Sequence, residues 1–194
     1  VAIVTGANGF FSVDDAQVAA HGLGAWARPL LPRIRHAPGL RFDAAEHAAL
    51  AAGGGPARLL HFAAGEPDPR AFAGPAAYLA AGEAAGLPAR HKCGIREPWF
   101  RVPHVRAGRF MLSKRCHLHP RVVLNEAGVL TTDTIYRGAL RAAGDEGAFV
   151  ASFHNGLTML AAELGGRSFG GGVLELVPSE IARLPVVLAP GAGG

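Results

Sequence analysis

The chain has 194 residues, of which 49% are hydrophobic, and a formal net charge of +4 at pH 7. This length suits one domain, or one domain with a small annex, and the apolar fraction is enough for a core. Because 27 glycines and 14 prolines favour turns and short elements, the composition excludes a protein built of long helices. No apolar run reaches the roughly 18 residues of a membrane span, so we expect no membrane partner.

The cysteine content and the N-terminal residues give expectations about the cellular compartment and about the parent polypeptide. Cys93 and Cys116 are too few for a disulfide framework, and we predict a reducing, cytoplasmic setting. The chain begins at Val1 rather than Met and lacks a basic leader. We therefore expect no signal peptide and a longer parent polypeptide.

The first half of the chain predicts short strands and helices in alternation. Asp14 and Asp43 precede two helical stretches and are suitable N-caps. Residues 28–39 contain three prolines and are expected to be irregular. The other expected elements are a strand at 1–5 that continues at 10–13 after a glycine turn, helices at 15–21, 44–52 and 75–85, and a strand at 58–63.

From Trp99 onward the pattern changes to short β-like runs separated by turn residues, at 99–102, 109–113, 121–125 and 130–136. Apolar residues at helical spacing then predict one long helix near 145–164. A strand at 173–177 and a helical turn at 179–184 complete the chain. The predicted fold class is α+β, with a mostly antiparallel sheet of short strands and flanking helices.

The segment 89–121 carries most of the positive charge. It holds nine Lys or Arg residues and one acid, Glu97, with Trp99, Phe100 and Phe110 among them. Cations suit phosphates and flat rings suit bases, so this composition favours a polyanion-binding surface. The alternative is a solvated surface over ordinary hairpins.

A glycine motif near the start supports a different hypothesis. Residues 1–10 resemble the opening strand and loop of short-chain dehydrogenases and nucleotide-sugar epimerases, which hold a pyrophosphate at a helix N-terminus. The third glycine is replaced near Ser12, and Asp14 and Asp15 place acids where the phosphates would lie. No strand ending in an acid follows about twenty residues later. An NAD-type oxidoreductase or epimerase fragment is kept as an alternative, beside a plain strand and turn.

Four blocks, in order, carry a stronger resemblance. They are VTGANGFF at 4–11, KCGIREPWFRVP at 92–103, LNEAGVLTTDTIY at 124–136 and ELGGRSFGGGVLELVP at 163–178. Together they resemble the C-terminal, target-recognition part of Eco57I/TaqI-like adenine-N6 DNA methyltransferases of bacterial restriction–modification systems. The resemblance covers nearly the whole chain.

The resemblance implies a DNA-recognition region that lacks the methyl-transfer site. In that family an N-terminal Rossmann-like domain binds S-adenosyl-L-methionine and carries an Asn/Asp-Pro-Pro-aromatic motif. The nearest tripeptides here, Glu97-Pro98-Trp99 and Asp68-Pro69-Arg70, lack the second proline. We therefore expect no catalytic residue and no cofactor in this chain, with the methyl donor bound by the parent enzyme. A second lobe is needed because the target base must be flipped out of the duplex.

The expected partners are double-stranded DNA, the N-terminal methyltransferase domain and, as a further candidate, restriction subunits. The whole of 1–194 is taken as one DNA-recognition region, with an α/β portion at 1–88 and a basic, sheet-rich portion at 89–194. A module that docks on a restriction or specificity subunit through the same basic face is the remaining alternative.

The DNA-contact residues are expected mainly in the basic segment. The phosphate-contact candidates are Lys92, Arg96, Arg101, Arg106, Arg109, Lys114 and Arg115. Arg96 is also the candidate for reading a guanine edge, with an ion pair as its alternative. Trp99 is a candidate for stacking on a base or for the core.

Several other polar residues carry open alternatives. Arg167 and Ser168, in the glycine-rich segment 165–172, are placed near a phosphate or in a long turn. Asn125 and Asp133 orient a loop or cap a turn. His154 and Asn155 face DNA or cap a bend. The cysteines and histidines that could suggest zinc lack the spacing of a zinc knuckle, so no metal is expected; these are Cys93, Cys116, His117 and His119.

Overall fold

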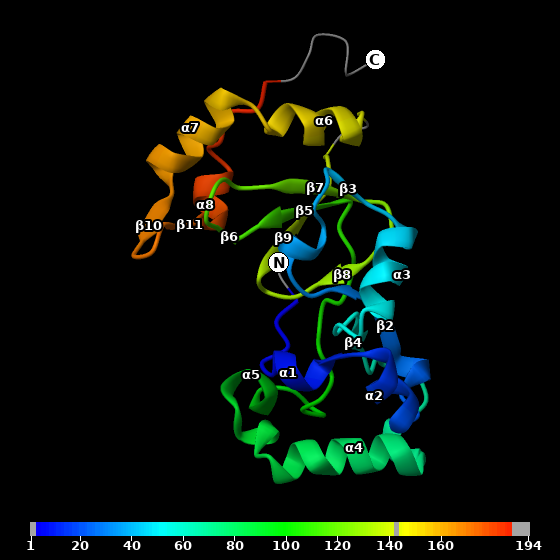
Figure 1. The fold of residues 1–194 in the computed structure, drawn as a ribbon. Helices are drawn as coiled ribbons and strands as arrows, with labels where there is room; N and C mark the ends of the chain where they lie inside the picture. Colours follow the sequence, from blue (N-terminus) through cyan, green and yellow to red (C-terminus); the bar gives the residue numbers. More distant parts are fainter. Residues whose placement is uncertain (1–2, 142–143, 188–194) are drawn as a thin grey trace.

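The computed structural model describes residues 3–141 and 144–187, and its ribbon is drawn in Figure 1. The described helices are α1 (Asn8–Phe11), α2 (Asp15–Ala20), α3 (Ala44–Ala52), α4 (Ala73–Ala84), α5 (His91–Gly94), α6 (Glu146–Phe153), α7 (Gly156–Gly165) and α8 (Pro178–Ile181). Short 3-10 helices are η1 (Gly24–Trp26), η2 (Ile34–His36), η3 (Pro69–Ala71) and η4 (Leu87–Ala89). The strands are β1 (Ser12–Val13), β2 (Ala27–Leu31), β3 (Arg41–Phe42), β4 (Arg58–Leu60), β5 (Phe110–Ser113), β6 (Arg115–Cys116), β7 (Val122–Asn125), β8 (Leu130–Thr131), β9 (Ile135–Gly138), β10 (Arg167–Phe169) and β11 (Val173–Glu175).

The described strands form three sheets, in the orders β1-β4-β2-β8, β3-β7-β5-β9 and β10-β11-β6. Most neighbours are antiparallel, but β2 pairs in parallel with β8 and β3 pairs in parallel with β7. The predicted α+β class with mostly antiparallel short strands is confirmed. The strands are divided among three sheets, whereas the sequence predicted one.

The chain passes from the first sheet to the second at η2, which lies between β2 and β3. In the two parallel pairings, Leu30 is opposite Leu130 and Arg41 is opposite Leu124. Strands from 1–88 and from 89–194 therefore share both four-stranded sheets. The segment that contains η2 therefore connects the first sheet to the second.

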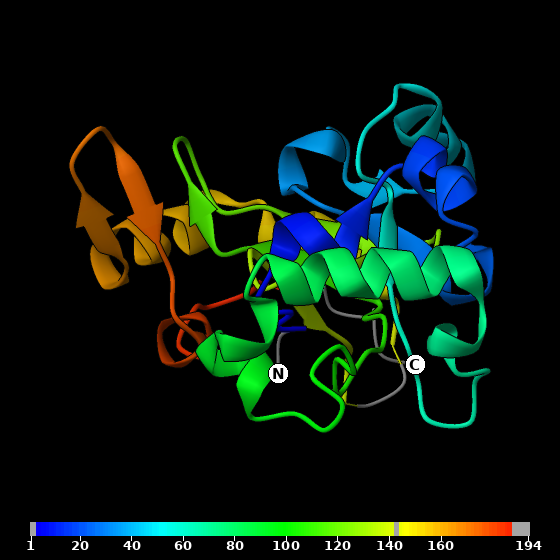
Figure 2. The same ribbon diagram turned by 90° about the horizontal axis from the view of Figure 1, so that it is seen from below.

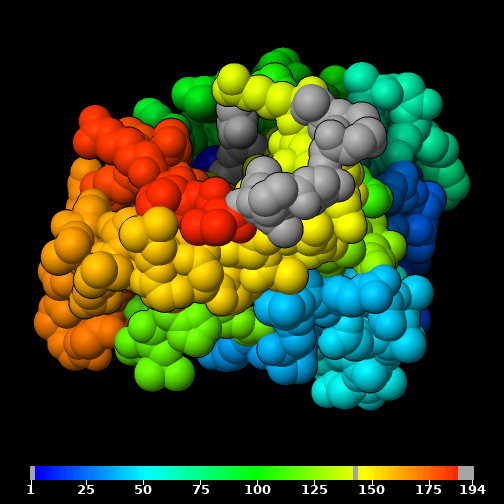
Figure 3. Space-filling view, turned by 90° about the horizontal axis from the view of Figure 1, so that it is seen from above, coloured from blue at the N-terminus to red at the C-terminus, as the bar shows by residue number. Residues whose placement is uncertain are grey.

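Apolar side chains pack below the first sheet and above the second. Below the first sheet, α4 lies across α1, where Tyr78 donates a hydrogen bond to the Phe10 carbonyl oxygen at 2.6 Å (Figure 2). Burial raises the pKa of Tyr78 to about 12. Above the second sheet lies α6 (Figure 1), and its Val150 and Phe153 pack with Leu112 and Leu124 of that sheet. In Figure 3, α6, α7 and the segment after them, yellow to red, cover this face.

The two predicted helix caps are confirmed, whereas other boundaries were wrong. Asp14 accepts from the Gln17 amide at 2.7 Å and Asp43 from the Glu46 amide at 2.9 Å, so α2 and α3 begin where expected. The segment 28–39, expected to be irregular, contains most of β2 and all of η2. Leu30 and Leu31 are fully buried, and sheet pairing outweighs the local effect of the prolines.

Two predicted strands are absent from the described residues. In the strand predicted at 1–5, the described residues make only an isolated bridge between Ile3 and Thr132, while Val1 and Ala2 lie outside them. A one-turn helix, α1, follows, so the described part of the glycine motif has neither the strand nor the long helix of a dinucleotide site. The run 99–102 is a turn whose Trp99 and Phe100 enter the core.

The predicted long helix is two helices, α6 and α7, divided at His154 and Asn155. Asn155 is the N-cap of α7 and accepts a hydrogen bond from the Thr158 amide at 3.0 Å. The His154 Nδ1 atom lies 2.8 Å from the Val150 carbonyl oxygen, and the Val122 amide donates to Nε2 at 3.4 Å. The polar pair therefore stabilises a bend, which was one of its two predicted roles.

Arg96 joins the N-terminal segment to α5. Its guanidinium donates to the carbonyl oxygens of Thr5, at 2.8 Å, and Val4, at 2.5 Å. The segment approaches so closely that a Cβ on Gly6, whose φ is +79°, would lie 2.8 Å from the Lys92 Cβ. Only glycine fits readily at this position. Half-buried Arg96 thus satisfies backbone acceptors that a shorter side chain would not reach.

We expect Arg96→Ala to destabilise the fold by about 1–3 kcal/mol, because two carbonyl groups lose a charged donor. Urea unfolding measures this loss. Arg101→Ala, which removes an exposed arginine from the neighbouring turn, is the matched control and should change stability by about 0.5 kcal/mol or less. Equal stability of the two variants would contradict this role of Arg96.

Stability should also fall as the pH is lowered below about 6.5, the ordinary pKa of histidine. Burial lowers the pKa of His154, so the unfolded chain takes up a proton more readily than the native state in that range. His154→Gln should make the pH dependence of the unfolding free energy shallower. Burial also lowers the pKa of His36 and His61, so part of the slope should remain.

Denaturant unfolding between pH 5 and 8 provides the measurement for His154, with His117→Gln as the control at an exposed position. An unchanged slope in His154→Gln would show that this ring does not couple protons to folding.

Candidate nucleic-acid interface

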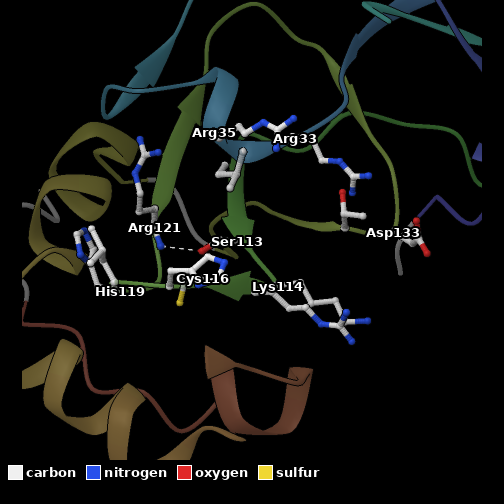
Figure 4. Close-up of a pocket in the computed structure, with 13 residues that line it drawn as sticks. Arg33, Arg35, Ser113, Lys114, Cys116, His119, Arg121 and Asp133 are labelled. Carbon is white, nitrogen blue, oxygen red and sulfur yellow. Dashed lines mark hydrogen bonds between the residues drawn. The ribbon is translucent and has the colours of Figure 1, made fainter. Parts of the chain in front are cut away.

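A groove of about 630 Å³ opens where the first two sheets meet (Figure 4). Three segments form its walls: η2 with the residue before it, the β5–β7 connection, and the turn between β8 and β9. The side chains labelled in Figure 4 surround the hollow from these segments. The lining residues are Arg33, Ile34, Arg35, Ser113, Lys114, Arg115, Cys116, His117, Leu118, His119, Arg121, Asp133 and Thr134.

The lining is strongly cationic. Five of its side chains are Lys or Arg, and its one acid is Asp133. That carboxylate accepts a hydrogen bond from Asn8 Nδ2 at 3.0 Å, which holds it at the edge of the N-terminal segment. Like charges on converging walls raise the local positive potential and attract a polyanion.

Arg121 connects two walls of the groove. Its Nη2 atom donates to the carbonyl oxygens of Ala37, Pro38 and Gly39 at 2.6–2.8 Å. Its backbone amide donates to Ser113 Oγ at 2.8 Å, the dashed line in Figure 4. The loop after η2 is thereby tied to the β5–β7 connection, and the spacing of the walls is fixed.

Lys114 and Arg115 line the groove but share an acid outside it. Arg115 Nε donates to Glu175 at 2.7 Å, and Lys114 Nζ lies 3.7 Å from the other carboxylate oxygen. The hydrogen bond from Arg115, assisted by the charges of both cations, lowers the pKa of the Glu175 carboxyl. This internal counter-ion offsets part of the charge on that wall.

Arg33 and Arg35, by contrast, are exposed and make no salt bridge with an acid in the described ranges. They flank Ile34 on η2 and are available to an anion. Neither arginine was predicted to contact DNA, because residues 28–39 were expected to be irregular. The signal was three arginines among three prolines within twelve residues.

Of the predicted DNA-contact residues, the groove brings together only Lys114 and Arg115. Lys92, Arg101 and Arg106 are exposed elsewhere. Arg109 pairs with Glu146 at 2.6 Å, and Arg167 with Glu180 at 3.0 Å.

Two more predicted residues have internal partners. Arg96 binds backbone carbonyls, as described above. Trp99 is 7% exposed, packs against Phe10, and donates from Nε1 to Glu83 at 3.2 Å, so its ring belongs to the core. The geometry favours the core alternative for Trp99, whereas Arg96 makes neither the predicted ion pair nor an open base contact but binds backbone carbonyls.

The remaining predicted polar residues lie in turns and a hairpin. Asn125 accepts from the Val129 amide and donates to the Val129 and Gly108 carbonyls, so it caps the 125–129 turn. Asp133 belongs to the groove. Ser168 is exposed on β10, which forms a hairpin with β11 where the sequence predicted a loop.

Neither a metal cluster nor a membrane span is found in the part of the chain that the structure describes. No group of three or more His, Cys, Asp or Glu side chains there could hold a metal ion. Within the same residues, no helix combines the length and the apolar character needed to cross a bilayer.

Comparison with protein families identifies the family of the chain. A search of curated proteins finds no match. The family model of the C-terminal domain of Type II methyltransferase M.Eco57I matches residues 1–192, which is nearly the whole chain. The same family was expected from four separate blocks of sequence, and these blocks contribute to the N-terminal segment, α5 with the turn after it, the first and second sheets, and the β10–β11 hairpin. The chain therefore belongs to the family of the M.Eco57I C-terminal domain, from the methyltransferases of Type II restriction–modification systems.

Proposed function

We propose that this domain binds duplex DNA as the target-recognition portion of a site-specific adenine-N6 methyltransferase. It holds the duplex while an N-terminal domain, which binds S-adenosyl-L-methionine, transfers the methyl group. The observation that carries the proposal is the convergence of five cationic side chains on the groove between the sheets. The family match supports a methyltransferase context.

The geometry suits a phosphate backbone. Arg33 and Arg35 present planar guanidinium groups that can each donate two hydrogen bonds to one phosphate. Arg121 fixes the opposite wall through its three carbonyl partners. A groove of about 630 Å³ is too small for a duplex, so it receives a section of one strand while the duplex lies outside.

The ion pairs of Lys114 and Arg115 with Glu175 change which cations should contribute most to DNA binding. A cation already paired with Glu175 must give up or share that partner when a phosphate arrives, whereas Arg33 and Arg35 have no acid to leave. We therefore move the principal contacts from the segment 92–109 to the arginines flanking Ile34, with Lys114 and Arg115 in support. Arg96 and Trp99 are not retained as base-contacting residues.

Replacing Arg33 and Arg35 together by Ala should weaken binding to all duplex sequences and make the log–log salt slope less steep by about two, because roughly two phosphate contacts are lost. Fluorescence anisotropy with a labelled duplex at several salt concentrations measures both effects. The matched control is the pair Arg101→Ala and Arg106→Ala, which removes two exposed arginines outside the groove.

A larger loss in that control pair would place the DNA on the 92–106 surface. Binding to a restriction subunit that ignores salt, with no affinity for DNA, would instead support the interaction-module alternative.

We also expect this chain alone to transfer no methyl group to DNA, since it has no Asn/Asp-Pro-Pro-aromatic motif. The measurement is incorporation of tritium from labelled S-adenosylmethionine into duplex DNA, with a complete enzyme of the family as the positive control. Incorporation above the level without protein would contradict the assignment of chemistry to another domain.

A further inference from the structure

The cationic groove suits phosphates, which are alike at every base pair, so recognition of a DNA sequence needs a second element that reaches base edges. Both side chains first considered for that role, Arg96 and Trp99, have internal partners. The third sheet, β10-β11-β6, supplies another candidate beside the groove.

This third sheet begins in the wall of the groove. Its strand β6 contributes Arg115 and Cys116 to the groove lining, and β11 pairs with that strand, with Leu174 opposite Cys116. Because β6 ends at Cys116, the sheet has only two strands beyond Leu174. The tip from Phe169 to Val173 is therefore a two-stranded β-ribbon that extends from the groove wall.

The hairpin projects on the same side of the molecule as the groove walls. In Figure 2 the β10–β11 hairpin, in orange, extends upward beside the green connection between β6 and β7, and the blue η2 lies farther along the same edge. Figure 3 shows the same three segments side by side along its lower edge. A duplex that lies across the groove therefore meets the hairpin at one end.

Phe169 lines a shallow hollow that continues the groove. This hollow, of about 370 Å³, is formed by Phe169 and Val173 with Arg115, Cys116 and His117, and the last three also line the groove. Phe169 lies opposite Val173 in the hairpin and is 51% exposed. Successive strand residues point to opposite faces, yet all three residues of β10 are exposed, so the described residues cover neither face of this strand. An apolar ring thus lies open beside the cations of the groove.

The end of the hairpin is narrow and carries no acid. It consists of Gly170, Gly171 and Gly172, and a Cβ added to any of them would have no heavy atom within 4 Å. The φ angles of Gly171 and Gly172 are +79° and +73°, which the sharp turn requires and other residues disfavour. From 165 to 174 the one charged side chain is Arg167. No carboxylate in the end of the hairpin repels a polyanion.

We propose that the tip of the β10–β11 hairpin enters the major groove of bound duplex DNA, where Phe169 contacts the methyl groups of thymine; this inference rests on the proposed function. The major groove is about 12 Å wide and admits a two-stranded β-ribbon, whereas the minor groove is only about 6 Å wide. Paired bases present their edges there, and the C5 methyl of thymine is the apolar group on those edges. A phenylalanine ring suits that methyl group.

Duplexes that differ only in this methyl group test the contact. The 194-residue chain should bind an alternating adenine–thymine duplex about fourfold more tightly than the same duplex with deoxyuridine in place of thymidine, as burial of one methyl group predicts. Phe169→Ala should remove this difference. Leu164→Ala truncates an exposed apolar side chain on α7, outside the groove and the shallow hollow, and as the matched control should keep it. Fluorescence anisotropy measures each affinity.

A charged tip provides a test that does not depend on the ring. Gly170→Glu places a carboxylate where we expect the electronegative DNA groove, and should weaken binding to every duplex about tenfold. Gly24→Glu is the matched control, because it changes the net charge equally, a Cβ there also meets open space, and Gly24 lines neither the groove nor the shallow hollow. Its affinity should fall by less than about twofold, since its charge lies away from the DNA.

The outcomes separate the hairpin contact from the proposed function. Duplex binding that depends on Arg33 and Arg35 but is equal for thymine and deoxyuridine would leave the DNA function standing and overturn the hairpin contact. A thymine preference that persists in Phe169→Ala would also overturn it, as would equal affinities of Gly170→Glu and Gly24→Glu. No duplex binding by the unaltered chain would overturn both the function and the contact.

Discussion

The two parallel pairings, β2 with β8 and β3 with β7, determine most of what the domain can do. They pair β2 and β3, which are consecutive in the chain, with strands of the second half that lie in two different sheets. The chain between them, η2 and the residue before it, must therefore cross the junction of the sheets. The groove lies beside this crossing, and Arg33 and Arg35 line it because their segment is the crossing.

Charge density along the sequence proved a poor guide to where cations converge. The segment 89–121 is rich in Lys and Arg, but folding brings acids from far along the chain to several of them. Arg109 meets Glu146, and Lys114 and Arg115 meet Glu175. These partners lie 37 to 61 residues away, so local sequence could not reveal them. The family, by contrast, was predicted correctly, because it depends on the order of whole blocks.

The predictable parts of the fold were those fixed by local chemistry. An aspartate before an apolar helix supplies its own cap, so Asp14 and Asp43 marked α2 and α3 correctly. The strand β2 was missed because its proline pattern is unfavourable locally and only its partners β4 and β8 stabilise it. The bend between α6 and α7 was also missed as a boundary, because the apolar spacing continues across it.

The second core has a consequence for the order in which the protein can fold during synthesis. Leu31 and Phe42 are fully buried, yet they pack with Met111, Val123 and Ile135. A ribosome produces Phe42 69 residues, and Leu31 80 residues, before it produces Met111, the first of these partners. Contacts so distant in sequence form late and slowly. The arginines beside Ile34 thus reach their final positions only after the second half has emerged, and until then the early strands present unpaired edges to other chains.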